Sequence, residues 1–257
     1  MRRLGEIHRF GLFPLALIVA IAVGATALAA KPNKDPVVVE AGNLKITVDG
    51  GFAPEALPKS KPAPIVFFVS GKLETKDGAH PPALTTVELE GDKHVAIDVK
   101  GVPLCKSNGL QSTDTSQALT ECGDALVGGG WAEAEIQFPE QPPIPVRSKL
   151  LVINGGFKGG ITNLFIHAFI TIPTPAAIIT TVKVKRVHKG RYGLEAIATI
   201  PKIAGGSGSL TRFSLKIKPG ILTATCPDGH LNARGAALFS DGTRIKAEVA
   251  RPCTPKG

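Results

Sequence analysis

The chain has 257 residues, of which 43% are hydrophobic and 20% are charged, and its formal net charge at pH 7 is +9. It contains 29 glycines and 21 prolines, but apolar runs recur between them, which excludes a disordered chain. A single tryptophan and a single tyrosine are too few to stack successive nucleic-acid bases, so we predict no specific nucleic-acid binding.

Residues 1–30 are typical of a secretory signal peptide. A short basic region precedes an apolar run over residues 12–23, and Ala27-Leu-Ala29 supplies a small-residue cleavage site. An uncleaved membrane anchor is the alternative, because the apolar stretch is nearly long enough to span a bilayer. Pro14 and the small-residue exit favour cleavage. We therefore expect a mature chain of residues 31–257 without a membrane span, exported by the general secretory route and either secreted or associated with the cell envelope.

The leader contains three arginines and one glutamate, which leaves 27 basic and 20 acidic residues in the mature chain, a net charge of +7. This charge favours contact with anionic cell-surface polymers through screened, unspecific attraction. The alternative is that the charge only keeps the protein in solution.

Four cysteines in an exported chain predict two disulfides. We expect sequential pairing, Cys105 with Cys122 and Cys226 with Cys253, because each pair is close in sequence. A zinc site is the alternative, but the chain has no Cys-x-x-Cys motif and no histidines at zinc-finger spacing. We predict no metal and no cofactor.

Short runs of alternating polar and apolar residues, separated by Gly, Pro, Asn and Asp, predict an all-β protein of antiparallel, sandwich-like sheets. The expected strands cover residues 44–48, 64–69, 85–90, 95–99, 132–138, 149–153, 163–171, 178–187, 194–200, 211–217, 222–226, 232–239 and 244–250. Residues 163–171 are apolar on both faces, which predicts a central strand.

One short helix is expected within residues 112–126. Asp114 followed by Gln117 resembles a capping box, and Gly128-Gly-Gly130 is expected to end the helix. The helix would place Ala118, Leu119, Cys122, Ala125 and Leu126 on one face and return Cys122 to the strand that ends at Cys105.

A weak internal repeat relates residues 84–90 to residues 210–216. Both follow the pattern Leu-Thr-x-apolar-x-Leu-charged, and proline clusters at 139–145 and 173–175 could divide the chain. The pattern indicates an internal duplication with a break near residues 173–177, although two amphipathic strands can agree by chance.

Several motifs carry a resemblance over residues 44–253. They are Leu57-Pro-Lys59, Ala63-Pro-Ile65, Asp77-Gly-Ala-His-Pro-Pro-Ala-Leu84, Gly101-Val-Pro-Leu-Cys105, Ala125-Leu-Val-Gly128, Ile200-Pro-Lys-Ile-Ala-Gly-Gly206 and Cys226-Pro227. With these motifs the chain resembles an uncharacterised family of exported bacterial all-β proteins with two disulfides and no assigned activity. The resemblance implies no catalytic or ligand-binding residue.

The motifs that suggest chemistry all have a simpler interpretation. The loop at residues 205–209 lacks the final glycine and the following helix of a nucleophile elbow, and a flexible connection explains it better. Asp92 and His94 could bind a metal if their strand extends that far, but no third ligand is visible in the sequence, and surface polar residues are the better explanation. His167 lies between Phe165 and Phe169 and is expected to be a hydrogen-bonded core histidine. The remaining mature histidines are His80, His188 and His230.

The most basic stretch supplies the candidate polyanion contacts, Lys183, Lys185, Arg186, Lys189 and Arg191. Lys183 and Lys185 alternate with valines on one strand face, and Lys189 begins a hairpin tip. Such a site would bind anionic groups weakly and in a salt-dependent way. The alternative is that these lysines protect a sheet edge from association.

We therefore predict a secreted or envelope-associated, non-catalytic structural or binding protein that contacts anionic surface polymers. A sugar-binding module is conceivable, but Trp131 is the only tryptophan, next to a glycine run. The alternative function is an extracellular hydrolase whose site is assembled from distant strands.

Overall fold

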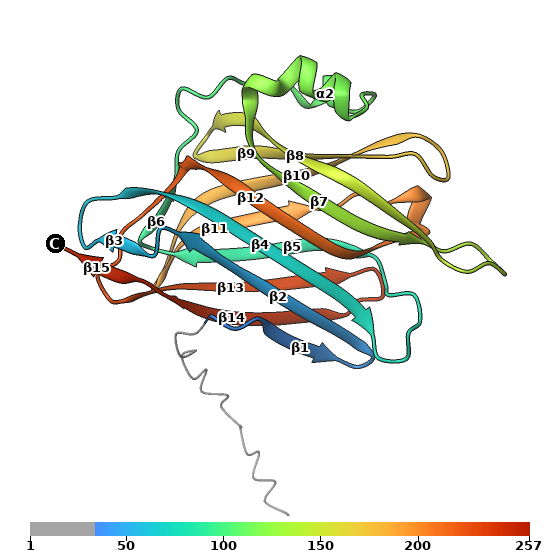
Figure 1. Cartoon of the computed structure of the whole chain (residues 1–257), viewed down its shortest axis with the longest axis horizontal. Helices are drawn as coiled ribbons and strands as arrows, with labels where there is room; N and C mark the ends of the chain where they lie inside the picture. The colour runs from blue at the N-terminus through green and yellow to red at the C-terminus, as the bar shows by residue number, and fades with distance from the viewer. Residues whose placement is uncertain (1–33) are drawn as a thin grey trace, which may run out of the picture.

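A computed structural model describes residues 34–257, and the predicted leader therefore lies outside the described residues. Strands dominate this region, and all but one of the strand pairs are antiparallel (Figure 1). The first strands are β1 (Val37–Ala41), β2 (Leu44–Ala53), β3 (Ala56–Pro58), β4 (Ala63–Thr75), β5 (Leu84–Asp92), β6 (Val95–Ile97), β7 (Leu126–Ile136) and β8 (Ile144–Lys158). They are followed by β9 (Ile161–Ile170), β10 (Ala176–Lys189), β11 (Tyr192–Thr199), β12 (Gly208–Ala224), β13 (His230–Phe239), β14 (Arg244–Pro252) and β15 (Thr254–Lys256). The helices are α1 (Ser107–Leu110) and α2 (Thr115–Cys122), with 3₁₀ turns at Gly123–Ala125 and Ala204–Gly206.

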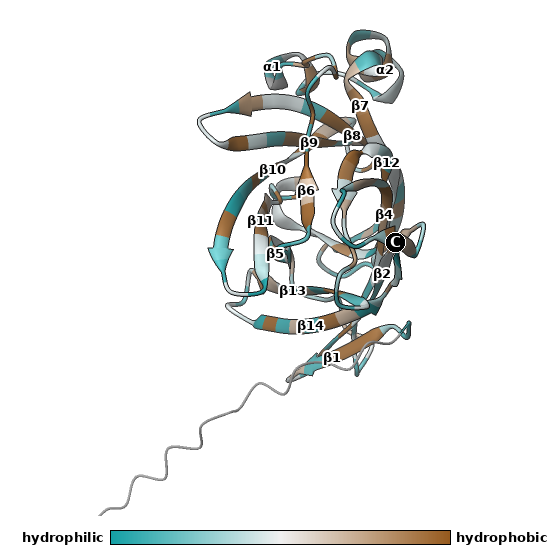
Figure 2. Ribbon diagram, turned by 90° about the vertical axis from the view of Figure 1, so that its left-hand side faces the viewer, coloured by the Kyte–Doolittle hydropathy of each residue, from teal (hydrophilic) through white to brown (hydrophobic). Residues whose placement is uncertain are grey.

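The main sheet runs in the order β1-β2-β4-β12-β7-β8-β9-β10-β11-β5-β13-β14, with β6 paired to β12. Figure 2 shows the strands following one another around the molecule until β14 returns to the side of β1, so that the sheet is a nearly closed, barrel-like sandwich. Arg251 of β14 joins this seam. Its guanidinium donates to the Gly50 carbonyl oxygen (2.5 Å) and to the Asp49 carboxylate (3.2 Å), both on β2.

The strand order repeats. The first half of the sheet has the order β1-β2-β4-β12-β7-β8, and the second half has the matching order β9-β10-β11-β5-β13-β14. The fourth strand in each half of the sheet comes from the opposite half of the chain. These exchanged strands are β12 and β5, which contain the two segments with the internal sequence repeat. The repeated order divides between β8 and β9, whereas residues 173–177 lie at and just before the start of β10. An internal duplication of the sequence stays a prediction.

Alternation along the strands produces an apolar interior. At one end the core contains Val99, Val127, Val152, Leu164, Val184, Leu194 and Ile221, and at the other Leu44, Ile46, Leu73, Leu84, Phe239 and Ile245. Each fully buried side chain of this kind contributes roughly 1.5–3 kcal/mol relative to the exposed chain. The alternation therefore explains why the sheet curls, because curling encloses the apolar face.

The expected central strand is confirmed, since β9 pairs with β8 on one side and β10 on the other. Its outer face is apolar because α1 and α2 cover it, as Figure 1 shows for α2 beside β8 and β9. His167 of β9 is fully buried there, and its Nε2 donates to the Thr113 carbonyl oxygen (3.0 Å), as expected of a core histidine.

The predicted helix is shorter than expected. The capping box is confirmed, because Asp114 accepts from the Gln117 amide (2.9 Å) and Gln117 accepts from the Asp114 amide (3.0 Å). The helix ends at Cys122, however, and Gly128-Gly-Gly130 lies inside β7, not at a helix end. Gly128 and Gly130 are required by the close approach of β12, since a Cβ on Gly128 would lie 2.4 Å from the Lys216 carbonyl oxygen and one on Gly130 1.8 Å from the Ser214 carbonyl oxygen.

Both predicted disulfides are present. Cys105–Cys122 attaches the helical segment to the outer face of β8 and β9, and Cys226–Cys253 closes a separate cluster with Leu57, Ile65 and Leu231. Beside the second disulfide, β3 and β15 form the parallel pair.

Most predicted strands are observed with shifted ends. The expected strands at 211–217 and 222–226 are one strand, β12, with a bulge between Ile217 and Leu222. β1, β3 and β15 are additional strands. β5 ends at Asp92, so Asp92 and His94 do not lie on one continuous strand.

We predict that Gly130→Ala lowers the free energy of unfolding by about 2 kcal/mol or more, because the added methyl group collides with backbone. Gly123→Ala is the control, since nothing lies within 4 Å of its Cβ position, and it should change stability by less than about 0.5 kcal/mol. Urea unfolding of both variants measures the difference, and equal stability of the two would contradict the close β7–β12 approach.

Candidate binding face

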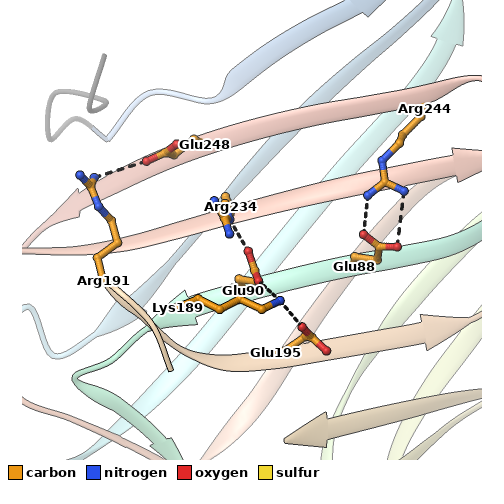
Figure 3. A network of polar contacts seen from close by, with 8 residues as sticks. All are labelled: Glu88, Glu90, Lys189, Arg191, Glu195, Arg234, Arg244 and Glu248. Carbon is orange, nitrogen blue, oxygen red and sulfur yellow. Dashed lines mark hydrogen bonds and ion pairs between the residues drawn. The ribbon is translucent and has the colours of Figure 1, made fainter. Parts of the chain in front are cut away.

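The predicted basic residues lie around the outer end of β10, where they meet a set of carboxylates. Directly opposite positions on five neighbouring strands form one row across the sheet, Lys185, Glu195, Glu90, Arg234 and Glu248. Residues directly opposite one another interact most strongly in a sheet. We call this row with Lys189, Arg191, Glu88 and Arg244 the ion-pair network, and Figure 3 shows all of its residues except Lys185.

Lys189 neutralises two adjacent carboxylates. Its Nζ lies 2.6 Å from Glu90 Oε1 and 2.6 Å from Glu195 Oε2, while Lys185 Nζ lies 2.7 Å from Glu195 Oε1. Arg234 also donates to Glu90. The hydrogen bonds from Arg234 and Lys189 hold the pKa of the Glu90 carboxyl below its ordinary value, and those from Lys185 and Lys189 do the same for Glu195.

The carboxylates lie beneath the cations. The side chains of Glu90 and Glu195 are only 13% and 12% exposed, whereas those of Lys189 and Arg234 are 48% and 46% exposed. Arg234 also stacks on the ring of Tyr192, 4.4 Å from its centroid. Burial raises the pKa of the Tyr192 phenol to about 12, so this ring stays neutral.

Two further pairs complete the network. Arg191 Nη1 lies 3.4 Å from Glu248 Oε1, and Arg244 Nη2 lies 2.5 Å from Glu88 Oε2. Three of the five predicted polyanion contacts, Lys185, Lys189 and Arg191, are therefore bound to carboxylates of the protein itself. Lys183 and Arg186 are exposed and have no carboxylate within 4 Å among residues 34–257.

A second outer face, on β4, β12, β7 and β8, has a different charge distribution. One row of opposite residues contains Lys72, Arg212, Glu133 and Arg147, the next contains Ser70, Ser214, Trp131 and Lys149, and the third contains Phe68, Lys216, Gly129 and Leu151. We call these three rows the Trp131 face. It takes residues from both halves of the chain, since β12 lies between β4 and β7.

The cations of the Trp131 face are less completely paired. Within residues 34–257, Arg212, Lys149 and Lys216 are exposed and lie more than 4 Å from every carboxylate oxygen. Lys72 pairs with Glu74, and Arg147 lies 3.7 Å from Glu133. The Trp131 face therefore presents cations that are available to an outside anion.

Trp131 lies half-buried at the centre of this face. Two of its neighbours on this face are small, Gly129 along the strand and Ser214 across it, and two are long, Glu133 and Lys149. The guanidinium of Arg147 stacks 4.6 Å from the Trp131 ring centroid. An open hollow of about 430 Å³ lies beside the face; its lining includes the cations Lys72, Arg147 and Arg212 and also the carboxylates Glu74, Glu133 and Glu135, but not Trp131. The face thus combines an aromatic ring with exposed cations, and the hollow with its mixed charges is a separate feature at its edge.

The Asp92 and His94 pair has a structural role. The Asp92 carboxylate accepts from the His94 amide (3.0 Å) and from the amide and side chain of Asn232 (2.9 Å each). The His94 ring lies 3.4 Å from Thr225 Oγ1 and 3.9 Å from Asp228 Oδ2, both longer than the contacts of a proton relay.

Three other residues that the sequence suggested for chemistry donate hydrogen bonds to backbone carbonyl oxygens. Ser209, at the end of the 205–209 loop, is buried and donates to the Pro81 carbonyl oxygen (2.6 Å). His80 Nε2 donates to the Glu135 carbonyl oxygen (3.0 Å), and His230 Nδ1 donates to the Asp228 carbonyl oxygen (3.1 Å). His188 is exposed on β10.

Across residues 34–257, no three His, Cys, Asp or Glu side chains gather closely enough to hold a metal ion. In the same part of the chain, no helix combines the length and apolar character needed to cross a bilayer. Comparison of the chain with family models, curated proteins and solved structures finds no match. The resemblance to exported bacterial proteins therefore stays a prediction.

The sequence contained a signal for the Trp131 face. Arg212, Ser214, Lys216 and Lys218 alternate with apolar residues, as Lys183 and Lys185 do. The sequence does not show how the strands pair, and only this pairing places Lys216 and Lys149 on either side of the strand that carries Trp131.

We predict that Lys189→Met destabilises the protein at pH 7 and that this loss shrinks at pH 3. Glu90 and Glu195 have lowered folded-state pKa values, so their stabilising contribution is present above their ordinary pKa and is lost as the pH falls through the lowered values. Without Lys189 two opposed carboxylates repel above that range, and protonation relieves the repulsion. Urea midpoints at both pH values measure the effect.

Lys183→Met is the matched control on the same strand, since Lys183 has no carboxylate partner among the described residues. A pH-independent loss of stability in Lys189→Met, or the same profile in both variants, would contradict the bridging role of Lys189.

Proposed function

We propose that this protein is a secreted or envelope-associated, non-catalytic binding protein whose Trp131 face holds an acidic polysaccharide. The observation that carries the proposal is the set of three exposed, carboxylate-free cations, Arg212, Lys149 and Lys216, around Trp131. A tryptophan ring can pack against the apolar face of a sugar, and the cations can pair with its acidic substituents.

The arrangement of the strands suits an extended ligand. Lys216 on β12 and Lys149 on β8 are separated by β7, which corresponds to two strand spacings or about 9.5 Å across the sheet, and by one row, about 6.6 Å, along it. A polymer with repeating acidic groups can therefore contact cations on both sides of Trp131 at once. Several weak contacts of this kind add up when they belong to one chain.

Nucleic acid fits this face less well than a polysaccharide. Proteins that bind single strands stack successive bases on several aromatic side chains. The Trp131 face has one such ring beside the cations and a second, Phe68, two strands away. The hydrolase alternative gains no specific support, because the His94 contacts are too long for a proton relay.

We predict that the double variant Arg212→Glu with Lys216→Glu binds heparin, a sulfated acidic polysaccharide, at least about tenfold more weakly than the unmodified protein in 0.1 M NaCl. Trp131 fluorescence should change on heparin addition in the unmodified protein. Titration calorimetry and the Trp131 emission measure both effects, and dextran serves as the uncharged polymer.

The matched control is Lys183→Glu with Arg186→Glu, which makes the same change in net charge on β10. It should change heparin affinity by less than about threefold at this salt concentration. Equal weakening by both double variants would show that net charge, not the Trp131 face, determines binding. Tight binding of single-stranded DNA by the Trp131 face would contradict the assignment to polysaccharide.

A further inference from the structure

Two of the most exposed large apolar side chains lie together at one end of the molecule. Leu104 is 61% exposed and Phe157 is 65% exposed, compared with 42–54% for Val38, Phe68 and Ile172. Phe157 lies near the end of β8, at its hairpin with β9, and Leu104 lies in the loop that leads to Cys105. We call Leu104 and Phe157 the apolar tip.

The fold holds the apolar tip in place by contacts that are themselves buried. Asn154 is 2% exposed, and its Nδ2 donates to the carbonyl oxygens of Val102 and Pro103 (3.1 Å each). Its Oδ1 accepts from the Gly156 amide (2.9 Å), and its carbonyl oxygen accepts from the Cys105 amide (3.0 Å). One buried side chain thus ties the loop of Leu104 to the strand of Phe157.

Two further features fix the position of Leu104. The Cys105–Cys122 disulfide fastens the next residue, and a Cβ on Gly156 would lie 2.7 Å from Leu104 Cδ1. Gly156, the residue before Phe157, therefore leaves the space that the Leu104 side chain occupies against β8. Because exposing apolar surface to water is unfavourable, a rigid support that keeps two such side chains exposed indicates that they contact another surface.

Three exposed lysines lie in the two segments that carry the apolar tip. Lys100 and Lys106 flank Leu104, Lys158 follows Phe157, and all three are exposed. The same segments, residues 98–106 and 154–160, contain one acidic residue, Asp98, and two further exposed acidic residues, Glu121 and Asp124, lie on either side of Cys122, the disulfide partner of Cys105. Two side chains offer too little apolar area for a stable protein interface, whereas apolar anchors surrounded by lysines suit a bilayer with anionic lipids.

We propose that the apolar tip inserts into the surface of a membrane containing anionic lipids, with Lys100, Lys106 and Lys158 contacting the headgroups. This contact is peripheral and separate from the Trp131 face, so it does not depend on the proposed polysaccharide binding. The expected binding is reversible, because two apolar side chains and three lysines give only modest affinity.

The test is sedimentation of the purified protein with vesicles of phosphatidylcholine alone and with 30% phosphatidylglycerol. We expect binding to the anionic vesicles only, and Leu104→Ser with Phe157→Ser should weaken it at least about tenfold. The control, Val38→Ser with Ile172→Ser, changes two other exposed apolar side chains and should bind like the unmodified protein.

A second measurement locates the inserted residue. Phe157→Trp in a Trp131→Phe background places the only tryptophan at the tip, and its emission should shift to the blue with anionic vesicles. Ile172→Trp in the same background should not shift. Equal vesicle binding by the two double serine variants would overturn the proposal, and so would an unshifted emission of Phe157→Trp. If the protein sediments without vesicles and Leu104→Ser with Phe157→Ser abolishes this sedimentation, the proposal is also overturned, because the tip then forms a contact between copies of the protein.

Discussion

The sheet curls almost onto itself and therefore encloses one interior. The two-residue alternation along its strands determines which side chains face this interior and which face outward. Apolar residues such as Val152 and Leu164 face inward and drive the curling. All charged and aromatic side chains that could meet a partner are consequently left on the outer face or at the strand ends. Where the outer face is apolar, as on β8 and β9, the chain covers it with α1 and α2 and fastens the cover with a disulfide.

On the outer face, the depth of the carboxylates distinguishes two surfaces with similar numbers of cations. In the ion-pair network the carboxylates of Glu90 and Glu195 lie beneath the lysines and neutralise them by ion pairing. On the Trp131 face, Lys149 and Lys216 have no carboxylate within 4 Å among the described residues. Net charge or the density of lysines in a segment therefore gives a poor indication of where an anion binds, because the neutralising groups come from neighbouring strands.

Features that depend on nearby residues were predictable from the sequence. Both disulfides, the capping box of α2 and most strands follow from local spacing and alternation. β3 and β15 were missed because each is short and contains proline, and β12 was divided because its bulge carries Pro219-Gly220. The Gly128-Gly-Gly130 run was misassigned because only the tertiary approach of β12 explains it. The Trp131 face needed cross-strand register, which local pattern does not contain.

The exchange of β5 and β12 links the fold to both outer faces. β12 brings Arg212 and Lys216 between β4 and β7, and β5 brings Glu88 and Glu90 between β11 and β13. Neither half of the chain carries all the residues of either surface, so a chain folded only over its first half would keep Trp131 and lose two of the three unpaired cations beside it. The Arg251 contacts to β2 and the pairing of β15 with β3 fix the C-terminal strands against the first ones, and the Cys226–Cys253 disulfide joins the end of β12 to the end of β14. The insertion of β12 between β4 and β7 is therefore the step of the topology that assembles the proposed binding face.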